Sequence, residues 1–316
     1  MNKKTQNKKA LSTIRKINRR KLPIVSAFLT LLILVVVLFS YRIYNTLFNL
    51  NNKTDFTSDA PDECSLAVTF LDVGQGNCVL IESDGHYMLV DGGTNDKSSF
   101  VVSYLKNKGI TKLDYVIISH YDADHLSGTI GAMYNFDVGT LLSGDYETDT
   151  KIYRSYLTCI DKQNISPVHP SVGDYFTLGK SEFEVVCPDK YTFDNENDNS
   201  IGIRIHDDYH SFLILGDAAK ESEKAMISSG MNLSSDVYMV SHHGSKSSTS
   251  AAFLDYVSPT YAVISVGAGN SYGHPSDTIL KRLESRNIET FRTDLNGTIT
   301  AYSTPDNIKW SLEKAP

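Results

Sequence analysis

Short apolar runs of four to six residues recur along the chain from Leu66 onward, and turns or helical stretches separate them. Runs of this length are typical of buried strands. They cover residues 68–71, 78–81, 87–90, 115–118, 212–215, 237–240 and 261–266. Between the third and fourth runs, Phe100, Val101, Tyr104 and Leu105 recur at helical spacing, which predicts a helix that Gly109 ends. The pattern therefore predicts a mixed α/β domain over residues 66–316.

A much longer apolar stretch precedes this domain. Residues 22–41 carry no charge, and as a helix they would be about 30 Å long, which matches the hydrocarbon core of a membrane. The basic residues before it predict a cytoplasmic N-terminus and an extracytoplasmic domain. A cleaved signal peptide is the alternative, but its apolar region is normally shorter, and no Ala-x-Ala site follows. We expect a cytoplasmic tail (1–21), a transmembrane anchor (22–42) in the cell membrane and a polar linker (43–65).

Charge is unevenly distributed along the chain. Nine of its 30 lysines and arginines lie within residues 1–22, where no acid occurs, which leaves 21 cations against 37 acids and a net charge of −16 for the remainder. Such acidity argues against a broad basic surface for long nucleic-acid tracts. It does not exclude a phosphodiester substrate, because bound divalent ions reverse the local sign of charge.

Five of the predicted strands end in aspartate or histidine. Their ends are Asp91-Gly92-Gly93, His120-Tyr121-Asp122-Ala123-Asp124-His125, Gly216-Asp217, His242-His243-Gly244 and His274-Pro275. Ligands at strand ends suit a metal centre, because rigid strands aim them while loops let them converge. Taken singly, Asp91 would also fit a turn, Asp217 would fit a helix cap for residues 218–228, and His274 would fit a plain loop. Their repetition favours a metal site, and it leaves open which of His242 and His243 is a ligand.

The cysteines and other motifs give no competing chemistry. Cys64, Cys78, Cys159 and Cys187 are widely spaced, so a thiolate zinc site is not expected. Free thiols are favoured over a disulfide, which an extracytoplasmic location would permit. The chain has neither a Gly-x-Ser-x-Gly elbow nor a phosphate-binding Gly-x-x-x-x-Gly-Lys-Ser/Thr loop.

The ordered motifs resemble the metallo-β-lactamase superfamily and, within it, the hydrolase domain of ComEC-type DNA-uptake proteins. The strings that carry this resemblance are LDVGQGN (71–77), LVDGG (89–93), ISHYDADHLSG (118–128), NSIGIRI (199–205), LILGD (213–217), VSHHGSKSS (240–248), NSYGHP (270–275) and RTDLNGTI (292–299). It covers about residues 66–302 and implies an αββα sandwich with metals at one edge between the sheets.

The resemblance also implies one or two divalent ions, zinc or manganese, with magnesium as a further candidate. One ion would take His120 and Asp122, the other would take Asp124, His125 and His243, and Asp217 would bridge them. Asp91 would lie behind the ligands and orient a histidine.

Two departures from the family pattern affect the first ion. Asp122 replaces the usual second histidine, and Asn199 or Ser200 stands near the place of another missing histidine. The first ion would therefore have fewer nitrogen ligands and more oxygen ligands, which favours manganese or magnesium over zinc. A smaller departure is Asn77, where the relatives usually have aspartate.

The expected activity is metal-dependent hydrolysis of a phosphodiester, such as DNA, by activated water. Asp124 would orient the water and accept its proton, while His274, Lys246 and Ser245 would contact the substrate or leaving group. Asn199 and Ser200 are further candidates for substrate contact. Two alternatives stay open: a hydrolase of esters, lactones or β-lactams, and a non-catalytic metal-stabilised module that binds nucleic acid or an envelope partner.

Overall fold

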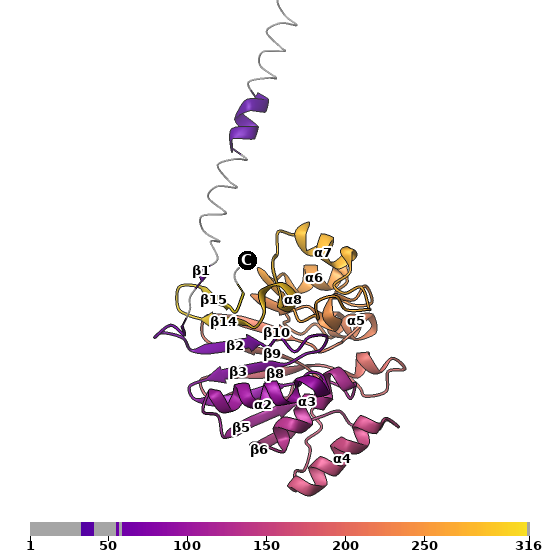
Figure 1. Cartoon of the computed structure of the whole chain (residues 1–316). Coiled ribbons are helices and arrows are strands. Elements are labelled where there is room, and N and C mark those ends of the chain that lie inside the picture. Colours follow the sequence, from indigo (N-terminus) through magenta and orange to yellow (C-terminus); the bar gives the residue numbers. More distant parts are fainter. Residues whose placement is uncertain (1–32, 41–54, 57–58, 315–316) are drawn as a thin grey trace, which may run out of the picture. The chain divides into compact units, whose positions relative to one another are not determined.

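The computed structural model describes residues 33–40, 55–56 and 59–314 of the chain. It divides into two units, Met1–Thr54 and Asp55–Pro316. The second unit contains all the strands in the described part of the chain, and the predicted site residues lie within it (Figure 1).

In the first unit, the described residues 33–40 form a helix of eight residues. Nowhere in the described residues is a helix both long enough and apolar enough to cross a bilayer. This finding contradicts the predicted anchor over 22–42 and the single-pass membrane location, which we correct here; the rest of that segment lies outside the described residues.

Two mixed sheets form the second unit. The first has the strand order β1-β15-β14-β2-β3-β4-β5-β6, and the second has the order β13-β12-β11-β10-β9-β8-β7. The first sheet comprises β1 (Asp55–Phe56), β2 (Leu66–Phe70), β3 (Val79–Ser83), β4 (His86–Val90), β5 (Lys112–Ile117), β6 (Asp137–Leu142), β14 (Ile299–Ser303) and β15 (Ile308–Leu312). The second comprises β7 (Tyr175–Leu178), β8 (Ser181–Cys187), β9 (Gly202–His206), β10 (Ser211–Ile214), β11 (Val237–Met239), β12 (Tyr261–Ile264) and β13 (Glu289–Arg292).

Alternating side chains along the strands build the core between the sheets. Leu66, Val68 and Phe70 of β2 pack in one buried cluster with residues of the second sheet such as Ile203 and Phe212. Intervening residues face outward, where Leu80 of β3 joins a second cluster with helical residues. Because the side-chain period of a strand is two, each sheet buries both of its faces.

Helices cover the two outer faces. On the first sheet these are α2 (Ser98–Asn107), α3 (Ala123–Met133) and α4 (Lys151–Gln163); on the second they are α5 (Lys220–Ser229), α6 (Ala251–Val257) and α7 (Asp277–Glu284). Shorter turns are η1 (Asn95–Lys97), η2 (Glu196–Asn199), η3 (Ser241–Gly244) and α8 (Thr293–Asn296). The layer order is helices, sheet, sheet, helices, an α/β fold with two mixed sheets. The helix predicted around Phe100 corresponds to α2, which buries Val101 and Leu105.

Parallel pairing brings the predicted strand ends together. β4 pairs with β5, and β10, β11 and β12 pair in sequence, all in parallel. Neighbouring parallel strands present their carboxyl ends at the same edge of a sheet. The segments that follow these five strands therefore meet at one edge of the sandwich.

Close backbone contact joins two of these segments. Gly92 donates its N–H to the carbonyl of His125, and Gly128 donates to the carbonyl of Gly93. A Cβ atom on Gly128 would overlap the carbonyl oxygen of Gly92. Only glycine allows α3 to lie this near the turn after β4, so Asp91 and His125 are held side by side.

Candidate metal centre

Three imidazoles and one carboxylate form the buried floor of the site. The side chains of His120 and His125 are 0% exposed, that of His243 is 2% exposed and that of Asp217 is 5% exposed. The Nε2 atoms of the three histidines and Oδ1 of Asp217 are buried and have no hydrogen-bond partner among the described residues. Buried polar atoms without partners are costly, so the chemistry of this donor set suits a bound cation.

Each imidazole is oriented from behind through its Nδ1 atom. His125 Nδ1 lies 2.8 Å from Asp91 Oδ2, and His243 Nδ1 lies 2.9 Å from the carbonyl oxygen of Ser265. Both partners accept only, so Nδ1–H must donate and the Nε2 lone pair is left toward the centre.

Ser119 extends the same support to the third histidine. Its hydroxyl donates to Asp91 Oδ2 at 2.7 Å and lies 3.0 Å from His120 Nδ1. Its backbone N–H donates to the other oxygen of Asp91 at 2.8 Å. Asp91 thus orients His125 directly and His120 through Ser119. The left-handed backbone of Asp91, with φ of 58°, marks the turn that the sequence also suggested.

Distances across the centre match shared metal coordination. His120 Nε2 lies 3.5 Å from Asp122 Oδ2, and His243 Nε2 lies 3.3 Å from Asp124 Oδ2. Asp217 reaches His125 Nε2 at 3.3 Å and His243 Nε2 at 3.6 Å. Two ligand atoms on one ion stand about 3.0 Å apart in octahedral geometry and about 3.4 Å apart in tetrahedral geometry. The donor set therefore fits divalent metal.

Two overlapping groups of side chains can each hold an ion. One consists of His120, His125 and Asp217, and the other of Asp124, His125 and His243. Asp122 belongs to neither group, but its Oδ2 lies 3.5 Å from His120 Nε2, beside the first group. The structure thus brings together all six residues predicted as ligands: His120, Asp122, Asp124, His125, Asp217 and His243.

Electrostatics at the site favour positive charge. Burial by itself lowers the pKa of His125, but the carboxylates of Asp217 and Asp91 raise it well above its ordinary value. Burial by itself raises the pKa of Asp217, yet His125 and His243 hold it well below its usual range. For Asp124, burial is likewise outweighed by His243 and His125, which bring its pKa to about 2. The carboxylates are therefore ionised at neutral pH.

Asp217 does not cap the helix that follows it. The first turn of α5 is capped instead by Asp198, whose Oδ1 accepts from Ala219 N at 3.0 Å and Ser222 N at 2.9 Å. Because Asp198 satisfies these donors, the carboxylate of Asp217 faces the histidines. Sequence reasoning missed Asp198, since nothing local connects it with α5.

Two carboxylates and a pocket form the open face. The side chains of Asp122 and Asp124 are 48% and 34% exposed. Beside Asp122 lies a pocket of about 580 Å³, whose polar lining includes Asn95, Thr150 and Lys151. The open face of the centre is therefore formed by the two carboxylates, and the imidazoles lie buried beneath them.

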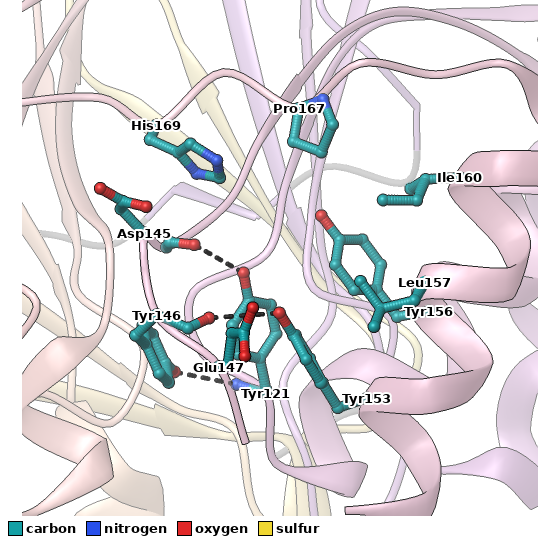
Figure 2. A pocket seen from close by; sticks show the side chains of 11 residues that line it. Tyr121, Asp145, Tyr146, Glu147, Tyr153, Tyr156, Leu157, Ile160, Pro167 and His169 are labelled. Carbon is teal, nitrogen blue, oxygen red and sulfur yellow. Dashed lines mark hydrogen bonds between the residues drawn. The ribbon is translucent and has the colours of Figure 1, made fainter. Parts of the chain in front are cut away.

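Tyrosine side chains surround Tyr121, the residue between His120 and Asp122 in the chain; Figure 2 shows the rings of Tyr121, Tyr146, Tyr153 and Tyr156. Tyr121 is 1% exposed, and its hydroxyl donates to the carbonyl of Gly144 at 2.7 Å. Its ring lies 4.7 Å from those of Tyr146 and Tyr153, centroid to centroid. A second pocket of about 440 Å³ opens among these rings. Because Tyr121 is fixed on several sides, its two ligand neighbours are held in place.

The remaining predicted residues lie around the rim. The His274 ring is 5.6 Å from that of His242 and 6.4 Å from that of His243. Ser245 is buried and its hydroxyl lies 2.9 Å from that of Ser247, whereas Lys246 is exposed.

Asn199 and Ser200 have partners within the protein. The Asn199 amide bonds with the backbone of Phe193 at 3.1 and 3.3 Å. Ser200 Oγ accepts from Asp217 N at 3.2 Å and lies 3.4 Å from His120 Nδ1. Ser200 therefore contacts two ligands from behind; substrate contact by either residue stays a prediction.

All four cysteines are free, as the sequence favoured. Cys78, Cys159 and Cys187 are buried, and burial raises the pKa of Cys187 to about 12. They take no part in the metal centre.

A family model described as the metallo-beta-lactamase superfamily matches residues 71–268. The chain is 30% identical over 248 residues to Competence protein ComA of Neisseria gonorrhoeae, covering 77% of this chain and 33% of that protein. It is 28% identical over 250 residues to ComE operon protein 3 of Bacillus subtilis (strain 168), covering 73% and 32%. The chain spans about a third of the length of these curated relatives.

Among solved structures, the chain resembles Igni18, described as a novel metallo hydrolase from the hyperthermophilic archaeon Ignicoccus hospitalis KIN4/I. The TM-score is 0.51 at 15% identity, with 74% of this chain and 98% of that chain covered. At this identity the similarity concerns the fold alone.

Proposed function

The chain belongs to the metallo-beta-lactamase superfamily, and we propose that it is a metal-dependent phosphodiesterase that cleaves nucleic acid. One observation carries the proposal: the unpartnered Nε2 atoms of His120, His125 and His243 converge with Asp217 beneath the exposed carboxylates of Asp122 and Asp124. The oxygen-rich side at Asp122 suits ions that bind phosphoryl oxygens. The competence proteins among its relatives point to DNA as the substrate.

The six candidate ligands would divide into two sets. His120 and Asp122 would hold one ion, while Asp124, His125 and His243 would hold the other, with Asp217 between them. When bound, divalent zinc or manganese supplies Lewis-acid chemistry, which acidifies water and offsets the charge that develops on a phosphoryl oxygen. Asp91 and Ser119 fix the imidazoles that face these positions.

Asp124 is the residue best placed to orient the nucleophilic water. Its Oδ2 lies 3.3 Å from His243 Nε2, and its side chain is partly exposed on the open face. An ionised carboxylate there accepts a hydrogen bond from water and aims the water's lone pair at phosphorus. We assign His274, whose ring lies 5.6 Å from that of His242, to the leaving oxygen.

Substrate binding would use the rim. The pocket beside Asp122 offers Asn95, Thr150 and Lys151, which suit a sugar and an adjoining phosphate. Lys246, exposed in the loop that follows β11, adds a second cation for the backbone of the substrate. Both lysines would attract an anion that the acidic chain otherwise repels.

The test uses the full chain with Mn²⁺ or Zn²⁺ on end-labelled single-stranded DNA and on bis-p-nitrophenyl phosphate. We expect metal-dependent turnover of at least one, and a roughly 100-fold or greater loss of kcat in Asp124→Asn with an unchanged circular dichroism spectrum. Asp149→Asn, at a fully exposed carboxylate, is the matched control. Absence of metal-dependent turnover on both substrates would refute the proposal, and hydrolysis of nitrocefin or a lactone instead would redirect it to another bond.

A further inference from the structure

Tyr272 is the most exposed large hydrophobic residue in the part of the chain that the structure describes. It is 70% exposed, and it lies in the loop that follows β12. A single exposed aromatic ring is common on protein surfaces and needs no special cause. The position of this ring relative to the candidate metal centre is what points to a function.

Ring contacts connect Tyr272 with the buried centre. Its ring lies 5.8 Å from that of His274, centroid to centroid, and the two planes differ by 25°. The His274 ring in turn lies 6.4 Å from that of His243, with 27° between the planes. His243 Nε2 lies 3.3 Å from Oδ2 of Asp124, the carboxylate that we assign to the nucleophilic water. One imidazole ring therefore separates Tyr272 from a candidate metal ligand.

The loop that carries Tyr272 is held in shape by the side chain of Asn270. Its Oδ1 accepts from the backbone N–H groups of Tyr272 and His274, both at 3.1 Å. Its Nδ2 donates to the carbonyl oxygens of Gly267 at 2.9 Å and His274 at 2.6 Å. Gly267 N in turn donates to Gln75 Oε1 at 3.2 Å, which ties this loop to the loop after β2. A ring on a loop fixed in this way binds a ligand with little loss of conformational entropy.

The immediate chain neighbours of Tyr272 carry no apolar side chain. Ser271 and Gly273 flank it, and both are exposed. A docked protein or a membrane surface needs a contiguous apolar patch, which one isolated ring does not supply. An isolated ring next to a site for cations suits instead a ligand that joins a planar group to an anion.

A nucleotide is such a ligand. Bases stack on exposed aromatic side chains, and the contact tolerates any sequence because every base has a π-face. Bases inside a duplex are stacked on one another, so a protein ring reaches a base in a single strand or a frayed end. With His274 assigned to the leaving oxygen, the base beside Tyr272 belongs to the leaving nucleotide.

From this placement we infer that Tyr272 is a stacking platform for the nucleobase on the leaving side of the scissile phosphate. The inference rests on the proposed function and narrows its substrate class to single-stranded nucleic acid. Tyr272 takes no part in the chemical step. It contributes to substrate binding, so its loss acts on KM rather than on kcat.

A purely structural role is the rival interpretation. In that role the ring only covers one side of His274 and keeps the imidazole in place. Leucine at position 272 would still cover His274, but it has no π-face on which a base can stack. Phenylalanine keeps the π-face and lacks only the hydroxyl. Variants with these two residues therefore separate stacking from cover.

The experiment compares two substrates of the same length and charge in the presence of Mn²⁺. One is a single-stranded oligothymidylate, and the other is a strand whose nucleotides are all abasic, so a difference in KM reports the bases alone. The full chain is assayed as wild type, Tyr272→Ala, Tyr272→Leu and Tyr272→Phe. Tyr209→Ala is the control, because Tyr209 is 48% exposed in the turn between β9 and β10, at the end of β10 away from Asp217.

On oligothymidylate, we expect Tyr272→Ala and Tyr272→Leu to raise KM roughly 5- to 150-fold with kcat nearly unchanged, as the loss of one stacked base implies. Tyr272→Phe and Tyr209→Ala should match the wild type, and every variant should match it on the abasic strand.

An unchanged KM for oligothymidylate in Tyr272→Ala would overturn the inference and leave the proposed function intact. A Tyr272→Leu protein that matches the wild type would overturn it too, because the ring would then serve only as cover. An equal rise in KM on both strands would likewise overturn it, since no base would be involved. A wild type that cleaves neither strand would remove the proposed function itself, and this inference with it.

Discussion

The carboxylate of Asp91 gives a sharp test of how the centre is built. It is 1% exposed and accepts three hydrogen bonds, from Ser119 N, Ser119 Oγ and His125 Nδ1 at 2.7–2.8 Å. Replacing Asp91 with Asn keeps the shape and the acceptor for Ser119 N. It places an amide N–H₂ where Oδ2 stood, so a donor now faces His125 Nδ1.

His125 must respond by moving its proton to Nε2, the atom that faces Asp217 at 3.3 Å. A protonated Nε2 has no lone pair for an ion. To bind an ion, His125 must move this proton back to Nδ1, and it then gives up the hydrogen bond from Nε2–H to the carboxylate of Asp217. A hydrogen bond to a charged group is worth about 1.5–3 kcal/mol. That equals a roughly 10- to 150-fold rise in Kd, within the range for residues that orient ligands.

The assay is a competition titration of Zn²⁺ or Mn²⁺ against a chromophoric chelator at pH 7, with circular dichroism to verify folding. Asp149→Asn again serves as the control, since its carboxylate is fully exposed. We expect weakened binding in Asp91→Asn and unchanged binding in the control. A folded Asp91→Asn protein with wild-type affinity for both ions would refute the reasoning that Asp91 sets the tautomer.

Three further predictions concern stability. Gly128→Ala should lower the free energy of unfolding by about 3 kcal/mol in urea titrations, because its Cβ overlaps the carbonyl of Gly92; an unchanged midpoint would contradict the close approach. Asp198→Ala should cost about 1–2 kcal/mol through the lost cap of α5, whereas Asp198→Asn should recover part of it. For Asp207, burial raises the pKa, but hydrogen bonds led by the backbone N–H of His210 lower it overall. The ionised Asp207 therefore stabilises the fold above about pH 4, and this stabilisation is lost as the pH falls through the lowered pKa. Asp207→Asn should have a smaller free energy of unfolding than wild type at pH 7, and the difference should vanish at low pH. A difference that stays constant with pH would contradict this.

Several features of the fold followed from local pattern. Short apolar runs predicted β2, β4 and β5 close to their observed bounds, and the spacing of Val101 and Leu105 predicted α2. Periodicity suffices there because a strand or helix is largely defined by which of its faces is buried. Hydropathy alone predicted an anchor over 22–42, whereas no helix in the described part of the chain is long and apolar enough to cross a membrane.

The candidate site divides in the same way. The residue types at the strand ends were enough to identify the imidazoles and carboxylates as candidate ligands. Residue type suffices for this because only particular side-chain atoms bind metal. Which nitrogen faces inward was decided by Ser119, Ser265 and Asp91, whose hydrogen bonds have no sequence signature.

Sequence by itself thus determined the kinds of element and the supply of ligands. Tertiary structure decided that Asp198 rather than Asp217 caps α5, and that the Nε2 atoms of His242 and His243 both lie near the carboxylate of Asp217. The physical reason is range: periodicity and composition act over a few neighbouring residues. The direction of a lone pair instead depends on strand pairing and on close packing between segments that lie far apart in the chain.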